Sequence, residues 1–442
     1  MSNARLVPRA SSDDGMGLPE VLVAMLIFAL VSLGLLHSIL SIMTTTRDAR
    51  LRQVALNLAA QAIDEARSRD DLFNLLDSTT SVPVGSDVFT VTMSTEWVSD
   101  PSVDLACGAG GGVLRYKRVN VEVTWANMRP VTEPVRADTV INPDARLNDP
   151  SKGTILVSVI RGDGSGSGGV TVSAVPLSGG PAPTPVTTDA EGCAYMLQVT
   201  PGDYRIQVSR SGYVDVNQQP SASRDVTVIQ GSSASASFQY DQSAMYTAHL
   251  ASNSATAPEV SADMPVTFVS TYGNATLAGS GRDRSHSLHP FASGYTAFAG
   301  SCTAADPEAW PDRVDAGVTY VGSRAPAVGT AAGGSAWLDV PTGLVTITLG
   351  GASTSGYLRF ESAAGPAGDP GCVTTVNLYL TGNGTGARTI ALPYGSWKVY
   401  RGGSSLSSRT TVVTAGVVPV TLGTFTPATG ILTLDPREVP AP

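Results

Sequence analysis

The four histidines are the first residues to test for catalysis or metal binding. His37 lies within a long apolar segment, His249 stands apart, and His286 and His289 are separated by two residues. A structural zinc site needs four ligands at close spacing, and no cysteine or carboxylate cluster accompanies the last two histidines. We therefore expect loop histidines at positions 249, 286 and 289, an interfacial or helix-packed His37, and neither a metal nor a cofactor.

No motif of a common catalytic site is present in the sequence. The G-x-S-x-G motif, which presents a nucleophilic serine, is absent. The glycine-rich segment 162–169 lacks the Lys-Ser/Thr pair of a phosphate-binding loop and predicts a hairpin turn. The formal net charge is −9 and no basic block appears, so nucleic-acid binding has no electrostatic support. These features predict a protein that is not an enzyme and has no nucleic-acid partner.

One acidic residue, Glu20, lies at the edge of the apolar segment 15–43. Between residues 21 and 36 only Ser32 and Gly34 interrupt the apolar run, which extends to Met43. A membrane-spanning helix needs about 20 such residues. A carboxylate in this setting costs about 2.5–3.5 kcal/mol and less near the interface, so it usually marks a function. We expect a membrane helix and a partner for Glu20.

The hexapeptide Gly15-Met16-Gly17-Leu18-Pro19-Glu20, followed by the apolar run, resembles the class III signal of type IV prepilins. The resemblance implies that a prepilin peptidase cuts between Gly15 and Met16 and methylates the new amino terminus of Met16. It also implies that Glu20 acts in assembly with other pilin subunits and the pilus assembly machinery. The sequence departs from the family pattern at Met16, where phenylalanine is commonest, at Pro19, and at the acidic Asp13 and Asp14.

The helix is expected to continue beyond the membrane. Residues 47–76 contain no Gly or Pro, and apolar residues recur at three- and four-residue steps, namely Leu51, Val54, Ala55, Leu58, Ala62 and Ala66. Arg67 and Asp71, like Glu65 and Arg69, are spaced for ion pairs on a helix. Segments 87–97 and 113–125 alternate as half-buried strands. The segment RLRQVALNLAAQAIDEAR resembles the helix of PilV-like minor pilins and of type II secretion pseudopilins.

The remaining chain reads as β-structure, because its 46 glycines and 29 prolines favour turns. Short apolar runs resume at Gly153, with a D-x-x-G turn and a strand in which Tyr204, Ile206 and Val208 alternate. This part resembles the carboxypeptidase-regulatory-like, prealbumin-type domain. Further strands are expected at GLVTITLGG, YLRFES, TTVNLYLTG, RTIAL, SWKVYRGG, RTTVVTAG, VPVTLGTF and GILTLD.

The expected fold is therefore an α+β pilin-type N-terminal domain, with a long N-terminal helix packed on an antiparallel sheet, followed by all-β sandwich domains. The predicted parts are a leader (1–15), a transmembrane or filament-core helix (16–43), an amphipathic helix with a pilin sheet (44–130), a linker (131–152), a carboxypeptidase-regulatory-like sandwich (153–242), a distal region of one or two sandwiches (243–436) and a tail (437–442).

The four cysteines all follow the apolar helix, and an even number in an exported region predicts disulfides. Three pairings are possible. We favour Cys302 with Cys372, because both lie in one predicted module, and Cys107 with Cys193, which crosses a predicted boundary.

Together, these features predict a minor pilin of a bacterial type IV pilus. Before assembly it would be a single-pass protein of the cytoplasmic membrane, and afterwards it would be displayed on the pilus and cell surface. Two alternatives remain, a type II secretion pseudopilin and a membrane-anchored surface adhesin outside any filament. A secreted hydrolase would need a catalytic site that the sequence does not show.

Overall fold

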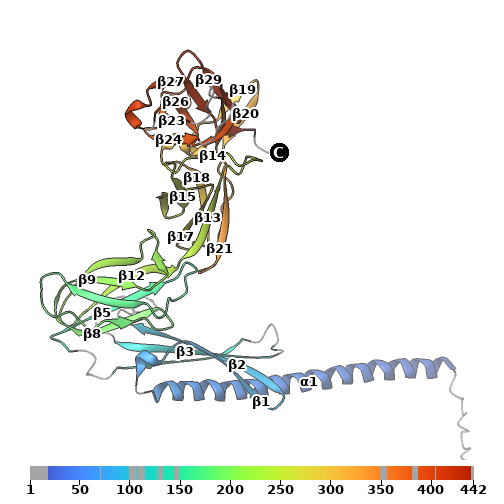
Figure 1. Ribbon diagram of the computed structural model, residues 1–442. Helices are drawn as coiled ribbons and strands as arrows, with labels where there is room; N and C mark the ends of the chain where they lie inside the picture. Colours follow the sequence, from blue (N-terminus) through green and yellow to red (C-terminus); the bar gives the residue numbers. More distant parts are fainter. Residues whose placement is uncertain are drawn as a thin grey trace, which may run out of the picture. The chain divides into compact units, whose positions relative to one another are not determined.

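The computed structural model describes residues 18–69, 71–98, 107, 115–126, 128, 133–143, 149–348, 356–380, 387–403 and 405–439 (Figure 1). The chain divides into two compact units. The first comprises Met1–Glu96 and Tyr116–Pro143, and the second comprises Trp97–Arg115 and Asp144–Pro442.

The first unit is built on one long helix, α1 (Leu18–Arg67). Its second half buries a single line of residues, namely Leu51, Ala55, Ala59, Ile63 and Ala66. Steps of four and three residues keep this line on one side of the helix. The predicted stripe is correct at three of these positions, but it omitted Ala59 and Ile63. Val54, Leu58 and Ala62 lie at the margin of the stripe, where they are only partly covered.

The helix ends at Arg67, nine residues earlier than predicted. Just beyond the end, the Ser68 hydroxyl donates to the Glu65 carbonyl (2.7 Å) and the Asp71 carboxylate accepts from the Phe73 amide (2.9 Å), which begins the short 3-10 helix η1 (Leu72–Asn74). Such side chains offer the backbone local partners that compete with the helix. The expected Arg67 to Asp71 pair is therefore wrong, whereas the pair between Glu65 and Arg69 is present at 3.1 Å.

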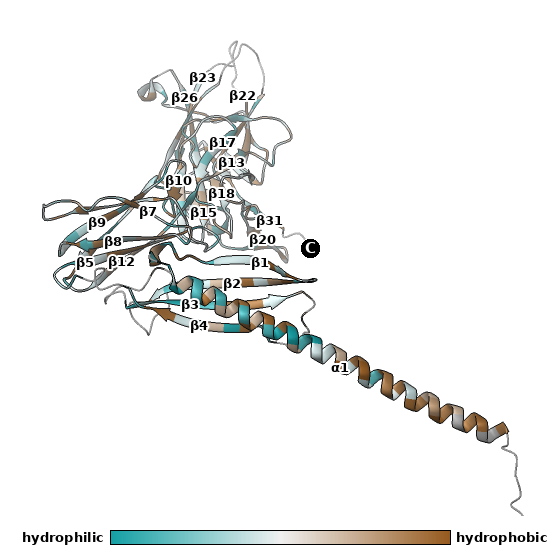
Figure 2. Cartoon of the chain, turned by 90° about the horizontal axis from the view of Figure 1, so that it is seen from below, coloured by the Kyte–Doolittle hydropathy of each residue, from teal (hydrophilic) through white to brown (hydrophobic). Residues whose placement is uncertain are grey.

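The sheet of the first unit has four antiparallel strands in chain order, namely β1 (Ser78–Val84), β2 (Asp87–Val98), β3 (Tyr116–Trp125) and β4 (Val135–Ile141). The helix packs on β3 and β4 (Figure 2). The sequence correctly predicted β2 and β3, including the burial of Val119, Val121 and Val123.

The predicted linker at 131–152 is wrong at its start, because it contains β4. That strand is antiparallel to β3, and the ladder runs from the pair Val123 and Val135 to the pair Lys117 and Ile141. Polar residues in the middle of β4 interrupt the alternation of apolar and polar residues by which a strand is predicted. Pairing with β3 supplies hydrogen-bond partners for its backbone, which makes it a strand. β1 was also missed. It is an edge strand, where Pro83 is tolerated.

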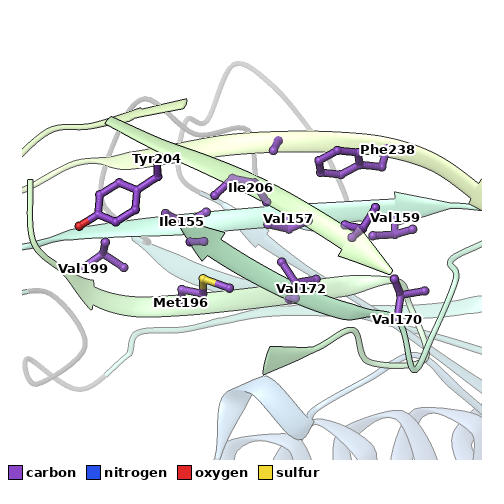
Figure 3. Close-up of a cluster of buried hydrophobic side chains, with 14 of the residues drawn as sticks. Ile155, Val157, Val159, Val170, Val172, Met196, Val199, Tyr204, Ile206 and Phe238 are labelled. Carbon is purple, nitrogen blue, oxygen red and sulfur yellow. The ribbon is translucent and has the colours of Figure 1, made fainter. Parts of the chain in front are cut away.

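The second unit begins with a sandwich at residues 153–242, here called the first module. Its two sheets have the strand orders β10-β12-β5-β8 and β11-β9-β6-β7. The strands are β5 (Gly153–Ile160), β6 (Thr171–Pro176), β7 (Val186–Thr187), β8 (Cys193–Val199), β9 (Gly202–Ser209), β10 (Tyr213–Asp215), β11 (Ser221–Val228) and β12 (Ser233–Gln242). The alternating side chains of β9, Tyr204, Ile206 and Val208, enter its core as predicted. Figure 3 shows Tyr204 and Ile206 in this core.

The second module covers residues 244–340 and has a core of its own. Its sheets have the orders β17-β13-β21 and β16-β15-β18. The strands are β13 (Ala244–Leu250), β15 (Val266–Ser270), β16 (Gly273–Leu277), β17 (Asp283–Leu288), β18 (Thr296–Ala299) and β21 (Ser335–Val340).

The third module covers residues 343–434 and contains strands at the predicted segments, with one correction. VPVTLGTF is not one strand, because it divides between β28 and β29, which belong to different sheets. Its sheets have the orders β14-β25-β22-β28 and β24-β23-β26-β30-β29, and β27 pairs with β26. The strands are β22 (Gly343–Thr348), β23 (Gly356–Ser362), β24 (Thr375–Leu380), β25 (Ala387–Leu392), β26 (Gly395–Gly402), β27 (Thr411–Val412), β28 (Val417–Pro419), β29 (Gly423–Thr426) and β30 (Ile431–Leu434), with the 3-10 helix η4 (Leu406–Ser408). The described residues of the region 243–436 therefore form two large cores, with a small cluster of Ala251, Leu344 and Ala391 besides.

The second and third modules share strands. β14 (Glu259–Val260) leaves the second module to pair with β25, and a segment between β18 and β21 reaches the end of the chain, where β20 (Val318–Gly322) pairs with β31 (Arg437–Glu438). That segment also contains the 3-10 helices η2 (Thr303–Ala305) and η3 (Pro307–Ala309) and the strand β19 (Arg313–Asp315). The predicted tail at 437–442 thus begins with a paired strand.

Candidate functional site

The apolar half of α1 is the strongest functional feature of the chain. The large apolar side chains described between residues 18 and 43 are exposed on every side of the helix, and this half of α1 is mostly brown in Figure 2. Hydroxyl groups within it bond to the helix itself, as when Ser38 Oγ donates to the Gly34 carbonyl (2.9 Å). By length and composition, this is the one helix in the described part of the chain that could cross a membrane.

The residues of the predicted processing site are only partly described. Gly15 and Met16 lie outside the described residues. The backbone of Glu20 belongs to the first turn of α1, but its side chain also lies outside the described residues. Cleavage, methylation and the assembly role of Glu20 therefore stay predictions.

The helix becomes polar after the apolar run ends at Met43, and Arg47 is the first charged residue beyond it. The Arg47 guanidinium pairs with the Asp87 carboxylate at the start of β2 (2.7 Å). From Leu51 onward, the buried line of α1 lies on the sheet. One continuous helix thus joins an uncovered apolar half to a half that packs on a sheet.

A groove runs beside the packed half of α1, where the helix leaves the β1 and β2 side of the sheet uncovered. Its volume is about 360 Å³. Its apolar lining includes Leu58, Ala62, Leu75, Val82, Val91 and Met93. The groove is large enough for a few aliphatic side chains, and its polar lining includes Glu65 and Arg69.

The two disulfides join Cys107 to Cys193 and Cys302 to Cys372, the pairings that the sequence favoured. Cys193 is positioned by a tight turn in which Asp189 Oδ1 accepts hydrogen bonds from the amides of Glu191 and Cys193 (3.0 and 2.9 Å). Gly192 in that turn has φ of 78°, and a Cβ atom there would collide with the Val159 carbonyl.

The reason given for the second pairing is wrong, because its cysteines belong to different modules. Cys302 follows β18 of the second module, and Cys372 lies between β23 and β24 of the third. This disulfide therefore joins two modules that also share strands.

The expectation that His249, His286 and His289 lie in loops is wrong for the first two. His249 lies in β13 and His286 in β17, two short strands whose mixed composition concealed them. His249 Nδ1 pairs with Asp283 Oδ1 at 2.5 Å. Burial lowers the pKa of His286 and of His289. The carboxylates of Asp241 and Asp215 partly oppose this effect by raising the pKa of His289. No group of three or more potential metal ligands occurs among the described residues.

The sequence analysis did not identify two features, a buried lysine and an exposed tryptophan. Lys117 is buried in β3 and its Nζ donates to the Leu72 carbonyl (3.0 Å). Trp337 lies on an exposed sheet face. The strict alternation of SAWLDV could have revealed the second.

No family model matches the sequence, and no curated protein matches it. Solved structures that resemble parts of the chain include the Bacillus anthracis TIE protein, with 13% identity over 74% of this chain and 68% of that chain and a TM-score of 0.21. A point variant of BcpA, the major pilin subunit of Bacillus cereus, is 12% identical over 61% of this chain and 94% of its own, with a TM-score of 0.21. A point variant of the shaft pilin SpaA of Lactobacillus rhamnosus GG is 13% identical over 43% of this chain and 99% of its own, with a TM-score of 0.18. Scores this low assign neither a family nor a function.

Proposed function

We propose that the chain is a non-enzymatic minor pilin of a bacterial type IV pilus, which carries β-modules to the cell surface. The observation that supports this most is the two-part helix α1. Its first half is apolar on all sides, and its second half is fixed to a four-stranded antiparallel sheet. The prepilin-like residues 15–20 overlap the start of that helix, which begins at Leu18.

The proposed mechanism is electrostatic. Cleavage before Met16 would create a free ammonium group, and Glu20 would be costly in an apolar setting without a counter-charge. Pairing of Glu20 with the amino terminus of an adjacent subunit offsets both costs and fixes the register between the two helices. The apolar halves of α1 then form the filament core, and the three modules remain outside it.

The size of the modules favours a sparse or terminal position in the filament. About 300 residues follow the first unit, more than the first unit itself contains. A repeating subunit of this size would obstruct its neighbours. A protein at the tip or at rare positions would not, and its modules would be available for adhesion or for priming assembly.

The test compares two glutamates of the same helix. In Glu20→Gln the charge is removed and the chain should insert in the membrane but be missing from sheared filaments. In the control Glu65→Gln, an exposed surface pair is removed, and incorporation should be normal. N-terminal mass analysis should find a methylated Met16 in the wild type.

Three results would contradict the proposal. Incorporation of Glu20→Gln at wild-type levels would exclude the pairing. An uncut leader in the functional protein would favour a membrane-anchored adhesin, and a processed chain held in the envelope without surface filaments would favour a secretion pseudopilin.

A further inference from the structure

The outward face of the sheet β17-β13-β21 carries a large aromatic side chain in solvent. In all three strands, alternate residues such as Tyr246, Leu288 and Leu338 enter the core of the second module. The residues between them point to the other side of the sheet. Trp337, in the middle of β21, is one of these and is 62% exposed. The chain's other tryptophans are at most 6% exposed, namely Trp97, Trp125, Trp310 and Trp397.

Polar groups surround the indole on this face. Trp337 stands opposite Thr247 in β13, and the Thr247 hydroxyl is hydrogen-bonded to that of Ser285 in β17 (2.8 Å). The ring of His249 lies 6.4 Å from the indole, centre to centre. We call the outward residues of the three strands the Trp337 face, namely Met245, Thr247, His249, Asp283, Ser285, Ser287, Ser335, Trp337 and Asp339.

The charge of the Trp337 face is negative. It includes two carboxylates and one imidazole, and no Lys or Arg occupies any of its positions. Asp283 pairs with His249, whereas Asp339 is exposed and follows Trp337 by two residues on the same side of the strand. The face keeps at least one net negative charge even when His249 is protonated.

We propose that the Trp337 face binds a basic segment of a partner protein. An arginine or lysine side chain would lie over the indole, since tryptophan is the best aromatic partner for a cation. Asp339 would be its counter-ion, and the hydroxyl groups of Thr247 and Ser285 would bond its neighbours. Charge complementarity selects this partner over an acidic one. The proposal goes beyond assembly and does not depend on cleavage of the leader.

The probe for the experiment is a hexa-arginine peptide added to the full chain in micelles of a polyoxyethylene detergent. Because Trp337 is the exposed tryptophan, quenching of the intrinsic fluorescence by acrylamide reports on it selectively. Hexa-arginine should protect Trp337 saturably. The protection should weaken as the ionic strength rises from about 0.01 M to about 1 M, which shortens the Debye length from roughly 30 Å to roughly 3 Å.

Matched variants locate the site. Asp339→Asn should weaken the binding of hexa-arginine about three- to fivefold. Asp315→Asn, which alters an exposed carboxylate on β19, should leave the affinity unchanged. Trp337→Ala should lose about tenfold in affinity by calorimetry, and its exposed position makes a folding defect a minor concern that circular dichroism would detect.

Three outcomes would overturn the proposal. One is equal protection of Trp337 by hexaglutamate or by an uncharged oligosaccharide such as maltohexaose. Another is an Asp339→Asn variant that binds as tightly as Asp315→Asn. The third is no protection by hexa-arginine at low ionic strength.

Discussion

Cys107 is disulfide-bonded to Cys193, 86 residues further along the chain at the start of β8. Between them lie β3 to β7, so the bond closes a loop that contains half of one sheet and the first strands of a sandwich. A cross-link of this span removes many conformations from the unfolded chain, and the chain-entropy relation gives about 4–5 kcal/mol for it.

Removal of this disulfide should therefore destabilise the first module. In Cys107→Ser/Cys193→Ser, hydrogen exchange measured by mass spectrometry should show faster exchange of the β5 and β8 amides, by a free energy of at most about 4–5 kcal/mol. In the control Cys302→Ser/Cys372→Ser, the faster exchange should occur at the contact of the second and third modules instead. Unchanged β5 and β8 protection in the first variant would contradict the pairing.

The packing of α1 on its sheet can be tested with two adjacent alanines. Ala59 is buried in the helix line and Ala60 is exposed. Ala59→Leu should cost about 1–3 kcal/mol because the larger side chain overfills a packed contact. Ala60→Leu should change stability by less than about 0.5 kcal/mol. Hydrogen exchange in β3 and β4 measures both, and equal effects would show that the helix does not pack on this line.

Two arginines near the end of α1 form a second matched pair. Arg67 donates from Nε and Nη2 to the hydroxyl of Thr139 in β4 (3.2 and 2.7 Å). Arg69 makes an exposed pair with Glu65. Arg67→Met should destabilise the first unit by about 1 kcal/mol, and Arg69→Met by no more than about 0.5 kcal/mol.

A double-mutant cycle assigns the Arg67 effect. The combination of Arg67→Met with Thr139→Val should cost less than the sum of the two single changes, since both remove the same hydrogen bonds. Strict additivity in the denaturant titration would mean that these bonds do not stabilise the unit.

Acid should destabilise the second module through His289. This side chain is buried, neither of its ring nitrogens has a hydrogen-bond partner in the structure, and burial lowers its pKa below the ordinary 6.5. In the unfolded chain His289 binds a proton as the pH falls through about 6.5, while in the folded chain it stays neutral until lower pH. The unfolded state then holds more protons, so stability falls as the pH falls.

The variant His289→Phe isolates this effect. It should reduce the dependence of the unfolding free energy on pH below 6.5 by at most about 1.4 kcal/mol per pH unit. His286, whose pKa is also lowered by burial and by Arg284, adds a similar slope, so the combination with His286→Phe should flatten the profile further. A slope that is the same in wild type and in the double variant would refute the assignment.

Local pattern was sufficient wherever a segment carried its own signal. The apolar run of α1, the alternation in β2, β3 and β9, and most strands of the third module were predicted from the sequence, because burial of one face leaves a fixed period in the sequence. The same reasoning missed β1, β4 and the strands of the second module, among them β13 and β17. Their polar or short segments become strands only when a neighbouring strand satisfies their backbone groups.

The candidate site divides in the same way. Residues 15–20 and the apolar run are contiguous, so the sequence by itself determined the prepilin-like signal, the position of Glu20 in it and a helix long enough to span a membrane. Tertiary structure decided where α1 ends, that Ala59 and Ile63 contact the sheet, that Cys302 joins two modules, and that Trp337 lies beside His249 and Asp339. The physical reason is that the first group depends on local periodicity, whereas the second depends on pairing between distant strands, which fixes which side chains share a face.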